Sequence, residues 1–251
     1  MGVADEAVTK LEPSGAEVRF DLRMVHERGT MRGIVPPRRG AMANDRPQKG
    51  FSLIELLIVV AIALIIAGFA VPNITEALRN YRLAGDVRNL KSEILLAKMR
   101  AAARFTRARV RANLDARSFQ TDIWNKQTSA WDPVTVGGPQ ILSQGVNYGV
   151  AGMTDPPVDE NGDPVQALLG QSPPCTNGAA GDPGGGGDIA NTACIQFNSR
   201  GFPVDASGAA TPDGALYIFS SDVVEGVSIS INGIARIWRG DGGATDYWIR
   251  R

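Results

Sequence analysis

Hydrophobic side chains are concentrated in one uninterrupted segment near the amino end of the chain, from Phe51 to Val71. Glu55 is the only charged residue within this segment, and the next charge along the chain is Glu76. A helix of about 21 residues extends roughly 30 Å, which is the thickness of the hydrocarbon core of a bilayer. Because a helix satisfies its own backbone hydrogen bonds in lipid, the pattern predicts a membrane-spanning helix over residues 51–72.

Two other structures share parts of this pattern. A buried core helix is usually shorter and less uniformly apolar. A secretory signal peptide has a basic end and an apolar middle, but its apolar part is shorter and uncharged. A carboxylate in hydrocarbon is unfavourable unless it is neutralised or paired, so Glu55 predicts a cationic partner at the same depth. If the chain were cut between Gly50 and Phe51, the new α-amine of one subunit could meet Glu55 of a neighbour.

Downstream of Pro72, apolar residues recur at helical spacing, which predicts that the helix continues through residues 73–106 as an amphipathic segment. A proline inside a helix removes one backbone hydrogen bond and tends to kink the helix. We expect the apolar face to pack on a sheet; the opposite face is basic, and it is either simply solvated or in contact with acidic partners or nucleic acid. The residues of the predicted apolar face are Ile74, Leu78, Tyr81, Val87, Leu90, Ile94, Ala97, Ala101 and Phe105.

Residues 107–251 change to the alternating pattern of strands. The pair Asn232-Gly233 lies between two alternating segments and predicts a hairpin. The expected fold is therefore α+β, with a long amino-terminal helix packed on a carboxyl-terminal antiparallel sheet domain. The predicted strands cover residues 109–114, 119–124, 140–150 with an interruption at Gly145, 194–197, 215–219, 227–231 and 234–238, with a last edge at 247–249.

Gly, Pro, Asp and Asn dominate residues 151–191, which predicts a long irregular insertion that is exposed and mobile. Within it, Asp159, Asn161 and Asp163 have the alternate spacing of a calcium loop. The pattern then fails, because Pro164 and Gly170 stand where such a loop needs Gly and Glu. Turn chemistry is the simpler interpretation of these residues.

The charge balance of 26 basic and 26 acidic residues gives no global attraction to nucleic acid. The single histidine, His26, precedes the apolar segment, so the rest of the chain lacks the commonest general base and metal ligand. Asp213, Asp222 and Glu225 could in principle lie together, but solvation at the surface is by far the favoured interpretation. We therefore expect no enzyme activity, no small-molecule substrate, no cofactor and no metal site.

The two cysteines are Cys175 and Cys194. In an exported domain the pair predicts one disulfide, which would close a loop of about 20 residues and contribute about 3 kcal/mol in the chain-entropy model. In a reducing compartment they would be two unrelated thiols. Two cysteines without a nearby histidine do not complete a zinc site.

The segment Gly50-Phe51-Ser52-Leu53-Ile54-Glu55-Leu56-Leu57-Ile58-Val59 resembles the cleavage and methylation signature of type IV pilins and of the pseudopilins of type II secretion. The resemblance implies that a prepilin peptidase cuts between Gly50 and Phe51 on the cytoplasmic side and methylates Phe51. It implies that Glu55 guides assembly with the helices of other pilins or pseudopilins, and Pro72 matches a frequent family position.

The same resemblance places the chain in the bacterial inner membrane as a single-pass protein with its carboxyl-terminal domain in the periplasm. Residues 1–50 then precede the mature protein. Residues 42–50 have the length of a basic leader peptide, so we expect that Met42 is the true start and that residues 1–41 come from a misplaced start.

The last strands resemble the carboxyl-terminal domain shared by minor pseudopilin H of type II secretion and the pilus protein FimT. The matching residues are 195–197, Gly201, 216–218 and 232–236. The resemblance implies a minor pseudopilin, a structural subunit of the pseudopilus that serves protein secretion across the outer membrane. The alternative is a FimT-like minor type IV pilin that acts in pilus assembly or in DNA binding and uptake.

Four arginines near the carboxyl end are the candidates for the nucleic-acid contact of that alternative. They stand beside Trp238 and Trp248, and interleaved arginine and aromatic residues can hold a phosphate backbone and stack bases. The segment 233–236 does not reproduce the Gly-Arg-x-Arg pattern of DNA-binding FimT proteins, which weakens this interpretation. The four residues are Arg236, Arg239, Arg250 and Arg251.

Overall fold

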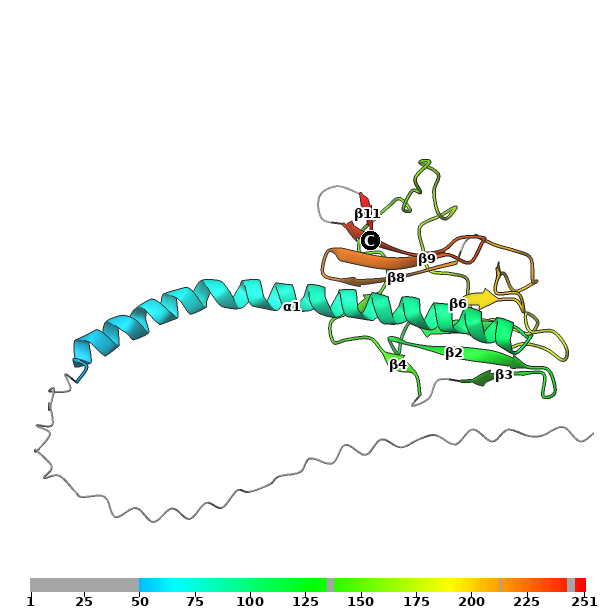
Figure 1. The fold of residues 1–251 in the computed structure, drawn as a ribbon, viewed down its shortest axis with the longest axis horizontal. Coiled ribbons are helices and arrows are strands. Elements are labelled where there is room, and N and C mark those ends of the chain that lie inside the picture. Colours follow the sequence, from blue (N-terminus) through cyan, green and yellow to red (C-terminus); the bar gives the residue numbers. More distant parts are fainter. Residues whose placement is uncertain (1–49, 135–137, 213, 243–246) are drawn as a thin grey trace, which may run out of the picture. The chain divides into compact units, whose positions relative to one another are not determined.

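A computed structural model describes residues 50–134, 138–212, 214–242 and 247–251. The predictions for residues 1–49 and for Asp213 therefore lie outside the described residues. Residues 52–251 form one unit, in which a single long helix precedes the strands in the described part of the chain, so the α+β prediction is confirmed (Figure 1). The elements are α1 Leu53–Ala103, β1 Ala108–Asn113, β2 Ser118–Asn125, β3 Ala130–Pro133, β4 Gln140–Ile141, β5 Asn147–Tyr148, β6 Thr192–Phe197, β7 Pro203–Val204, β8 Gly214–Ser220, β9 Val223–Ile229, β10 Ala235–Asp241 and β11 Trp248–Arg250.

Helix α1 has 51 residues and ends in a left-handed cap. The amide of Thr106 donates to the carbonyl of Ala101, the amide of Phe105 donates to that of Ala102, and Phe105 has a φ of 50°. This is the Schellman arrangement that closes a helix by using its last free carbonyls. The helix therefore ends at Ala103, three residues before the predicted end at residue 106.

The strands form two antiparallel sheets. The first has the order β3-β2-β1-β6-β7, with β4 also paired to β2, and the second has the order β11-β10-β9-β8-β5. Strands β9 and β10 are joined by the predicted Asn232-Gly233 hairpin, in which Gly233 has a φ of 72° and its amide donates to the carbonyl of Ser230. The predicted last edge is also present, because β11 pairs with β10.

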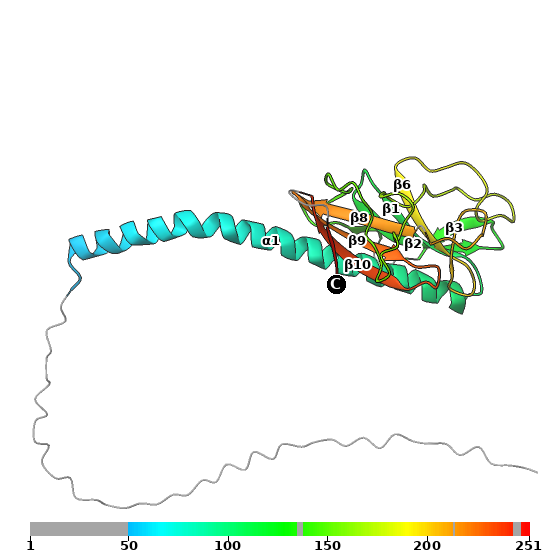
Figure 2. The same cartoon turned by 90° about the horizontal axis from the view of Figure 1, so that it is seen from above.

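One hydrophobic core joins the second half of α1 to both sheets (Figures 1 and 2). Its helical members are spaced three or four residues apart, so they form one stripe along α1. The prediction of a helix face packed on a sheet domain is confirmed for five residues, while Leu83 belongs to the stripe and was not predicted. The helical core residues are Leu83, Val87, Leu90, Ile94, Ala97 and Ala101.

The apolar face predicted for α1 extends too far in both directions. Ile74, Leu78 and Tyr81 are exposed, and so is Phe105 in the cap. The packed stripe begins only at Leu83, because the sheets lie along the carboxyl-terminal half of the helix and leave these side chains uncovered (Figure 2).

The predicted strand over residues 140–150 is wrong as a single element. Strand β4 pairs with β2 in the first sheet, whereas β5 pairs with β8 in the second sheet. The chain turns between them at Ser143–Val146, where the amide of Val146 donates to the carbonyl of Ser143. Gly145 has a φ of 86° in this turn, a backbone conformation that favours glycine. Strand β3 was not predicted.

The insertion over residues 151–191 is irregular, as predicted, but it is not exposed throughout. Met153, Gln166, Ser172, Cys175 and Thr176 are buried, and each is at most 5% exposed. Part of the segment therefore covers the sheets, while another part, which includes Val158 and Leu168, is exposed and projects from them (Figure 1).

Candidate functional site

The amino-terminal end of α1 presents an open backbone ahead of a regular helix. Gly50 and Phe51 precede the first helical residue, and Ser52 is extended with φ −71° and ψ 143°. Phe51 is 86% exposed. Glu55 lies in the first turn, where the free amides of the helix end favour a negative charge. The Gly50–Phe51 bond thus lies outside secondary structure and next to an acidic first turn.

The apolar half of α1 has no covering partner in the described part of the chain. Leu53 is 80% exposed and Phe69 is 74% exposed, and none of its most apolar stretch is buried. This helix is long and apolar enough to cross a membrane. Transferring so much apolar surface into water is unfavourable by roughly 25 cal/mol for each Å², so the segment requires a lipid or protein environment.

Helix α1 passes through Pro72 without a break. Proline has no amide hydrogen, so the carbonyl of Gly68, four residues earlier, has no helical donor at this position. The side-chain amide of Asn73 donates to the neighbouring carbonyl of Phe69 at 3.0 Å. Figure 1 shows that α1 curves along its apolar half, as expected for a helix that contains a proline.

Two acidic side chains of α1 attach the helix to the sheets, and neither was predicted as a functional residue. Both oxygens of the Asp86 carboxylate accept hydrogen bonds from Ser143, one from the amide at 2.8 Å and one from the hydroxyl at 3.0 Å. The Glu93 carboxylate accepts from the hydroxyl of Thr121 at 2.6 Å. Both acids are buried. The available signal was their spacing: seven residues are about two helical turns, so both acids lie on the face of α1 that carries the apolar stripe.

The four candidate arginines near the carboxyl end do not form an open cationic groove. Arg239 and Arg251 both form ion pairs with Glu225, a fully buried carboxylate on β9, at 3.0 and 3.2 Å. Arg250 pairs with Glu160. Arg236 lies in the field of Asp159, whose pKa is lowered chiefly by hydrogen bonds from the amides of Asn161 and Asp163.

The aromatic residues beside these arginines are also engaged. Trp238 is buried and its indole N–H donates to the hydroxyl of Ser228 at 2.8 Å. Trp248 donates to the carbonyl of Asp155 at 2.7 Å, and its ring lies 5.5 Å from that of Tyr217. These rings are therefore not presented as a free platform for stacking bases.

The suspected calcium loop is an ordinary turn. The Asp159 carboxylate accepts hydrogen bonds from the amides of Asn161 and Asp163 at 2.8 and 3.1 Å. This is the turn chemistry favoured by the sequence. Within the described residues, no group of three or more His, Cys, Asp or Glu side chains lies together as a metal site would require.

The insertion reaches the strand β8 through side chains that replace a neighbouring strand. The side-chain amide of Gln171 donates to the carbonyl of Tyr217 at 2.7 Å and accepts from its amide at 3.0 Å. The hydroxyl of Ser172 makes the same pair of contacts with Ala215, at 2.8 and 2.9 Å. These contacts satisfy backbone groups that an open sheet edge would leave free.

The same segment also contacts strand β6, so it bridges the two sheets. The amide of Cys194 donates to the carbonyl of Pro173 at 2.8 Å. The predicted disulfide between Cys175 and Cys194 is present, with a Cα–Cα distance of 5.0 Å. The disulfide thus holds the insertion in the gap between β6 and β8.

A buried ion pair holds the insertion at a second point. Arg109 on β1 pairs with Asp122 on β2 at 3.0 Å, and it donates to the carbonyl of Thr176 at 2.7 Å. The indole ring of Trp131 lies over the guanidinium, 4.1 Å from its carbon. Burial lowers the pKa of Arg109 to about 10, and the Asp122 carboxylate opposes this decrease.

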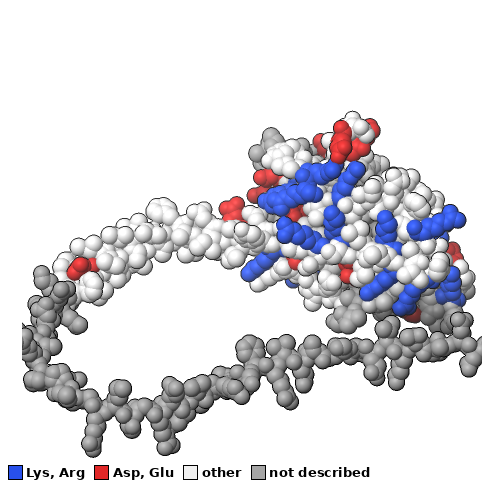
Figure 3. Space-filling view, in the orientation of Figure 1, with Lys and Arg blue, Asp and Glu red and all other residues white. Residues whose placement is uncertain are grey.

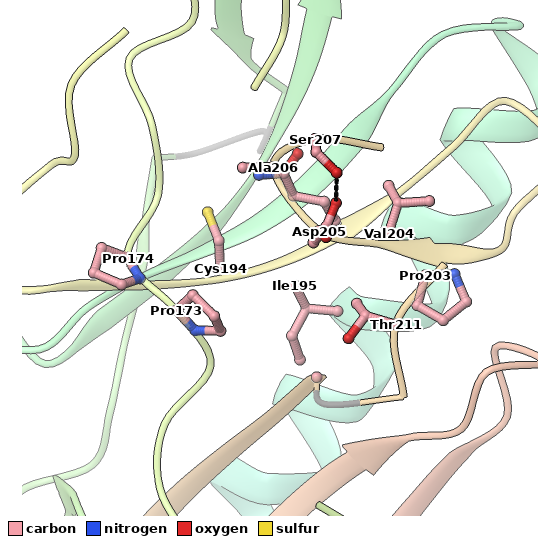
Figure 4. Close-up of a pocket in the computed structure, with 12 residues that line it drawn as sticks. Pro173, Pro174, Cys194, Ile195, Pro203, Val204, Asp205, Ala206, Ser207 and Thr211 are labelled. Carbon is pink, nitrogen blue, oxygen red and sulfur yellow. Dashed lines mark hydrogen bonds between the residues drawn. The ribbon is translucent and has the colours of Figure 1, made fainter. Parts of the chain in front are cut away.

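A cleft of about 360 Å³ continues the gap between the sheets beyond Pro173 and Pro174 (Figure 4). Its walls are mostly apolar, and among the described residues that line it Asp205 is the acidic one. The Asp205 carboxylate accepts a hydrogen bond from the Ser207 hydroxyl at 2.7 Å, which lowers the pKa of Asp205. The Asp205 carboxylate is thus engaged within its own turn.

Comparison with known proteins identifies the amino-terminal segment. Residues 45–71 match the family described as the prokaryotic N-terminal methylation motif, which contains Gly50, Phe51 and Glu55. No curated protein matches the chain. Among solved structures, the minor pseudopilin EpsH from the Type 2 Secretion System of Vibrio cholerae is similar over 65% of this chain and 99% of its own, with 14% identity and a TM-score of 0.38. The predicted type IV pilin signal is therefore confirmed for residues 45–71.

Proposed function

From a type IV pilin signal on a long helix that packs against antiparallel sheets, we propose that the chain is a minor pseudopilin, a structural subunit of a type II secretion pseudopilus. In this role it is processed by a prepilin peptidase and assembles with other pseudopilins through α1. Residues 51–72 anchor it in the inner membrane, and the sheet domain of residues 107–251 faces the periplasm. Its contribution is architectural, and no catalysis is required of it.

The observation that carries this proposal is the division of α1 into an uncovered half and a packed half. The uncovered half has the length of a bilayer core, and its one acid, Glu55, lies in the first turn. A protein that leaves such a surface open needs either lipid or the same surface of other subunits. Lipid would cover this surface before assembly, and the helices of neighbouring subunits would cover it afterwards.

Cleavage between Gly50 and Phe51 would supply the partner that Glu55 needs. The new α-amine of Phe51 would be a cation at nearly the same depth as the Glu55 carboxylate of an adjacent subunit. An opposite charge at this depth removes the unfavourable isolation of a carboxylate in an apolar environment. This pairing would also set the axial register between neighbouring helices.

The disulfide supports the periplasmic location of the sheet domain. Disulfides persist in oxidising compartments such as the bacterial periplasm and are rare in the cytoplasm. Cys175 and Cys194 are bonded, and the structure describes no free cysteine.

The alternative role, a FimT-like minor pilin that binds DNA, has less support. Arg239, Arg250 and Arg251 each face a carboxylate within the same domain. Phosphates would have to compete with these internal partners, which weakens the electrostatic contribution on which DNA binding depends.

The direct test is the amino terminus of the protein recovered from membranes, measured by intact mass and terminal peptide sequencing. We expect a start at Phe51 with one added methyl group. A chain that is uncut, or cut after Val71, would contradict the proposal.

A matched pair of variants tests the assembly role. Glu55→Gln should be processed normally but should reduce incorporation into sheared filaments at least about tenfold, which corresponds to about 1.4 kcal/mol of lost pairing. Glu76→Gln, a change at the next acid on the same helix, is the control and should assemble normally. Equal incorporation of the two variants would argue against a role for Glu55.

A further inference from the structure

The turns of α1 that follow its apolar half carry an exposed cluster of cations. Arg79, Arg82 and Arg88 are exposed, and within the described chain none of them forms an ion pair. Figure 3 shows Lys and Arg gathered over this face of the sheet domain and its helix, whereas the apolar half of α1 is almost uncharged. The cationic belt, as we call these three residues, directly follows the membrane-spanning segment.

The belt has one sign because the acids of the same turns point inward. Asp86 and Glu93 are buried and hydrogen-bonded to Ser143 and Thr121. The exposed acid nearby is Glu76, one turn closer to the apolar half. Packing of the helix on the sheets thus removes Asp86 and Glu93 from the surface and leaves Glu76 as the exposed acid beside Arg79 on α1.

The distance of the belt from the apolar segment matches the headgroup layer. At about 1.5 Å for each residue, Arg79 and Arg82 lie about 12 and 16 Å beyond Val71 along the helix. Side chains of a helix tilt toward its amino end, so both guanidinium groups extend back toward the membrane. Arg88, about 26 Å beyond Val71, is too far for direct contact but adds to the local potential.

Exposed side chains next to the belt, Leu78 and Tyr81, also indicate that this part of α1 lies at the membrane–water interface. Leu78 is 48% exposed and Tyr81 is 77% exposed, although both lie among the arginines. Tyrosine is enriched at the membrane–water interface, where its ring and hydroxyl meet different environments. In water, these two exposed apolar side chains would be unfavourable, whereas at the interface their apolar surface is covered.

We propose that the cationic belt binds the headgroups of anionic phospholipids, with Tyr81 in the interface and Arg79 and Arg82 on the phosphates. The proposal rests on the proposed membrane anchoring of α1. Opposite charge favours this partner, because anionic headgroups attract basic residues that lie next to a membrane span. The contact would hold the sheet domain close to the bilayer until the subunit is extracted into the filament.

The test reconstitutes the full chain in bilayers that contain spin-labelled phosphatidylglycerol or phosphatidylcholine and measures which lipid is immobilised at the protein. We expect a preference for phosphatidylglycerol of about fivefold for each arginine that reaches the surface. The preference should approach one in 0.5 M salt and in the variant Arg79→Gln/Arg82→Gln, because the attraction is electrostatic.

The control variant is Arg104→Gln/Arg200→Gln, which removes the same charge from exposed positions. Arg104 lies about 50 Å beyond Val71 along the chain's helical rise, so this variant should retain the preference. An equal affinity for both lipids would overturn the proposal and favour an acidic protein surface as the partner. A preference that survives in the Arg79→Gln/Arg82→Gln variant would overturn it as well, because other residues would then bind the lipid.

Flotation with phosphatidylcholine vesicles in 0.5 M salt separates this inference from the proposed function. A chain that floats without a lipid preference keeps its membrane anchor and loses only the headgroup site. A chain that does not float would contradict the proposed membrane anchoring by α1, and with it the headgroup site.

Discussion

The two halves of α1 have the same backbone conformation but opposite relations to the rest of the chain. Between Leu53 and Val71 the large apolar side chains are exposed, whereas from Leu83 to Ala101 an apolar stripe is fully or almost fully buried. The acids differ in the same way, since Glu55 is exposed while Asp86 and Glu93 are buried and hydrogen-bonded. The chain therefore contains the partner of one half, while the partner of the other half must come from outside.

This difference explains how one helix can serve two environments. The packed half has apolar residues on one stripe, because the two sheets together cover only one face of the helix. The uncovered half is apolar around its whole circumference, because lipid or several neighbouring helices surround it. The cationic belt marks the transition between the two.

Truncation of one leucine in each half of α1 tests this difference most directly. Leu90→Ala creates a cavity in the core and should lower the free energy of unfolding of the sheet domain by about 2–5 kcal/mol. Leu57→Ala removes the same atoms from the uncovered half and should change it by less than about 0.5 kcal/mol. Denaturant unfolding in detergent, followed by tryptophan fluorescence, measures both. Similar losses would mean that the uncovered half also packs on the sheets.

The disulfide should matter only to the sheet domain. Replacing both Cys175 and Cys194 by Ser removes a closed loop and should lower the free energy of unfolding by about 2–4 kcal/mol. Reduction of the unmodified protein should give the same loss, which separates the disulfide from the serine side chains. Flotation with vesicles should be unaffected, and an unchanged unfolding midpoint would show that the insertion is held without the bond.

Alkaline pH should lower the free energy of unfolding of the sheet domain. The groups responsible, Tyr148 and Tyr217, lie in that domain and not in the uncovered half of α1. Burial raises the pKa of Tyr148 and Tyr217 above their usual value of 10, so above pH 10 unfolding is coupled to ionisation of both phenols. Their stabilising contribution is complete below pH 10 and decreases above it, by up to about 1.4 kcal/mol for each pH unit and phenol. The pKa of Arg109 is lowered to about 10, so this one group increases the free energy of unfolding over the same pH range. The two phenols together outweigh it.

The measurement is a denaturant midpoint between pH 9 and pH 11.5, with Tyr217→Phe for comparison. The variant should depend less steeply on pH, because one of the two phenols is gone. Its hydroxyl donates to Gln166 at 2.6 Å, so the variant should also be less stable at neutral pH. A pH dependence as steep as that of the unmodified protein would exclude Tyr217 as a source.

The elements that depend on nearby residues could be predicted from the sequence. The hydropathy of Phe51–Val71, the Asn232-Gly233 hairpin and the alternation in most strands each involve a few adjacent residues. The motif around Gly50 and Glu55 is local in the same way. Each of these signals depends on periodicity or on turn chemistry, which the chain expresses before it folds.

The errors arose where the answer depended on distant residues. A periodic stripe shows which face of a helix is apolar but not how far its partner extends, so Ile74, Leu78 and Tyr81 were assigned to the core. The separation of β4 from β5 depends on which sheet each joins. The ion pairs of the carboxyl-terminal arginines join residues as far apart as Glu160 and Arg250, a relation that no local pattern contains.

A membrane-length helix with one acid, a processing signal at its amino end and a β domain with two cysteines follow from the order of the amino acids. Which surfaces stay open follows from the packing of distant segments. This packing turned Asp86 and Glu93 inward, paired Glu225 with two arginines, and left Arg79, Arg82 and Arg88 without ion-pair partners in the described chain. A charged side chain stays unpaired only where no opposite charge lies close to it in space. Which charges lie close together is established only when distant segments of the chain pack against each other.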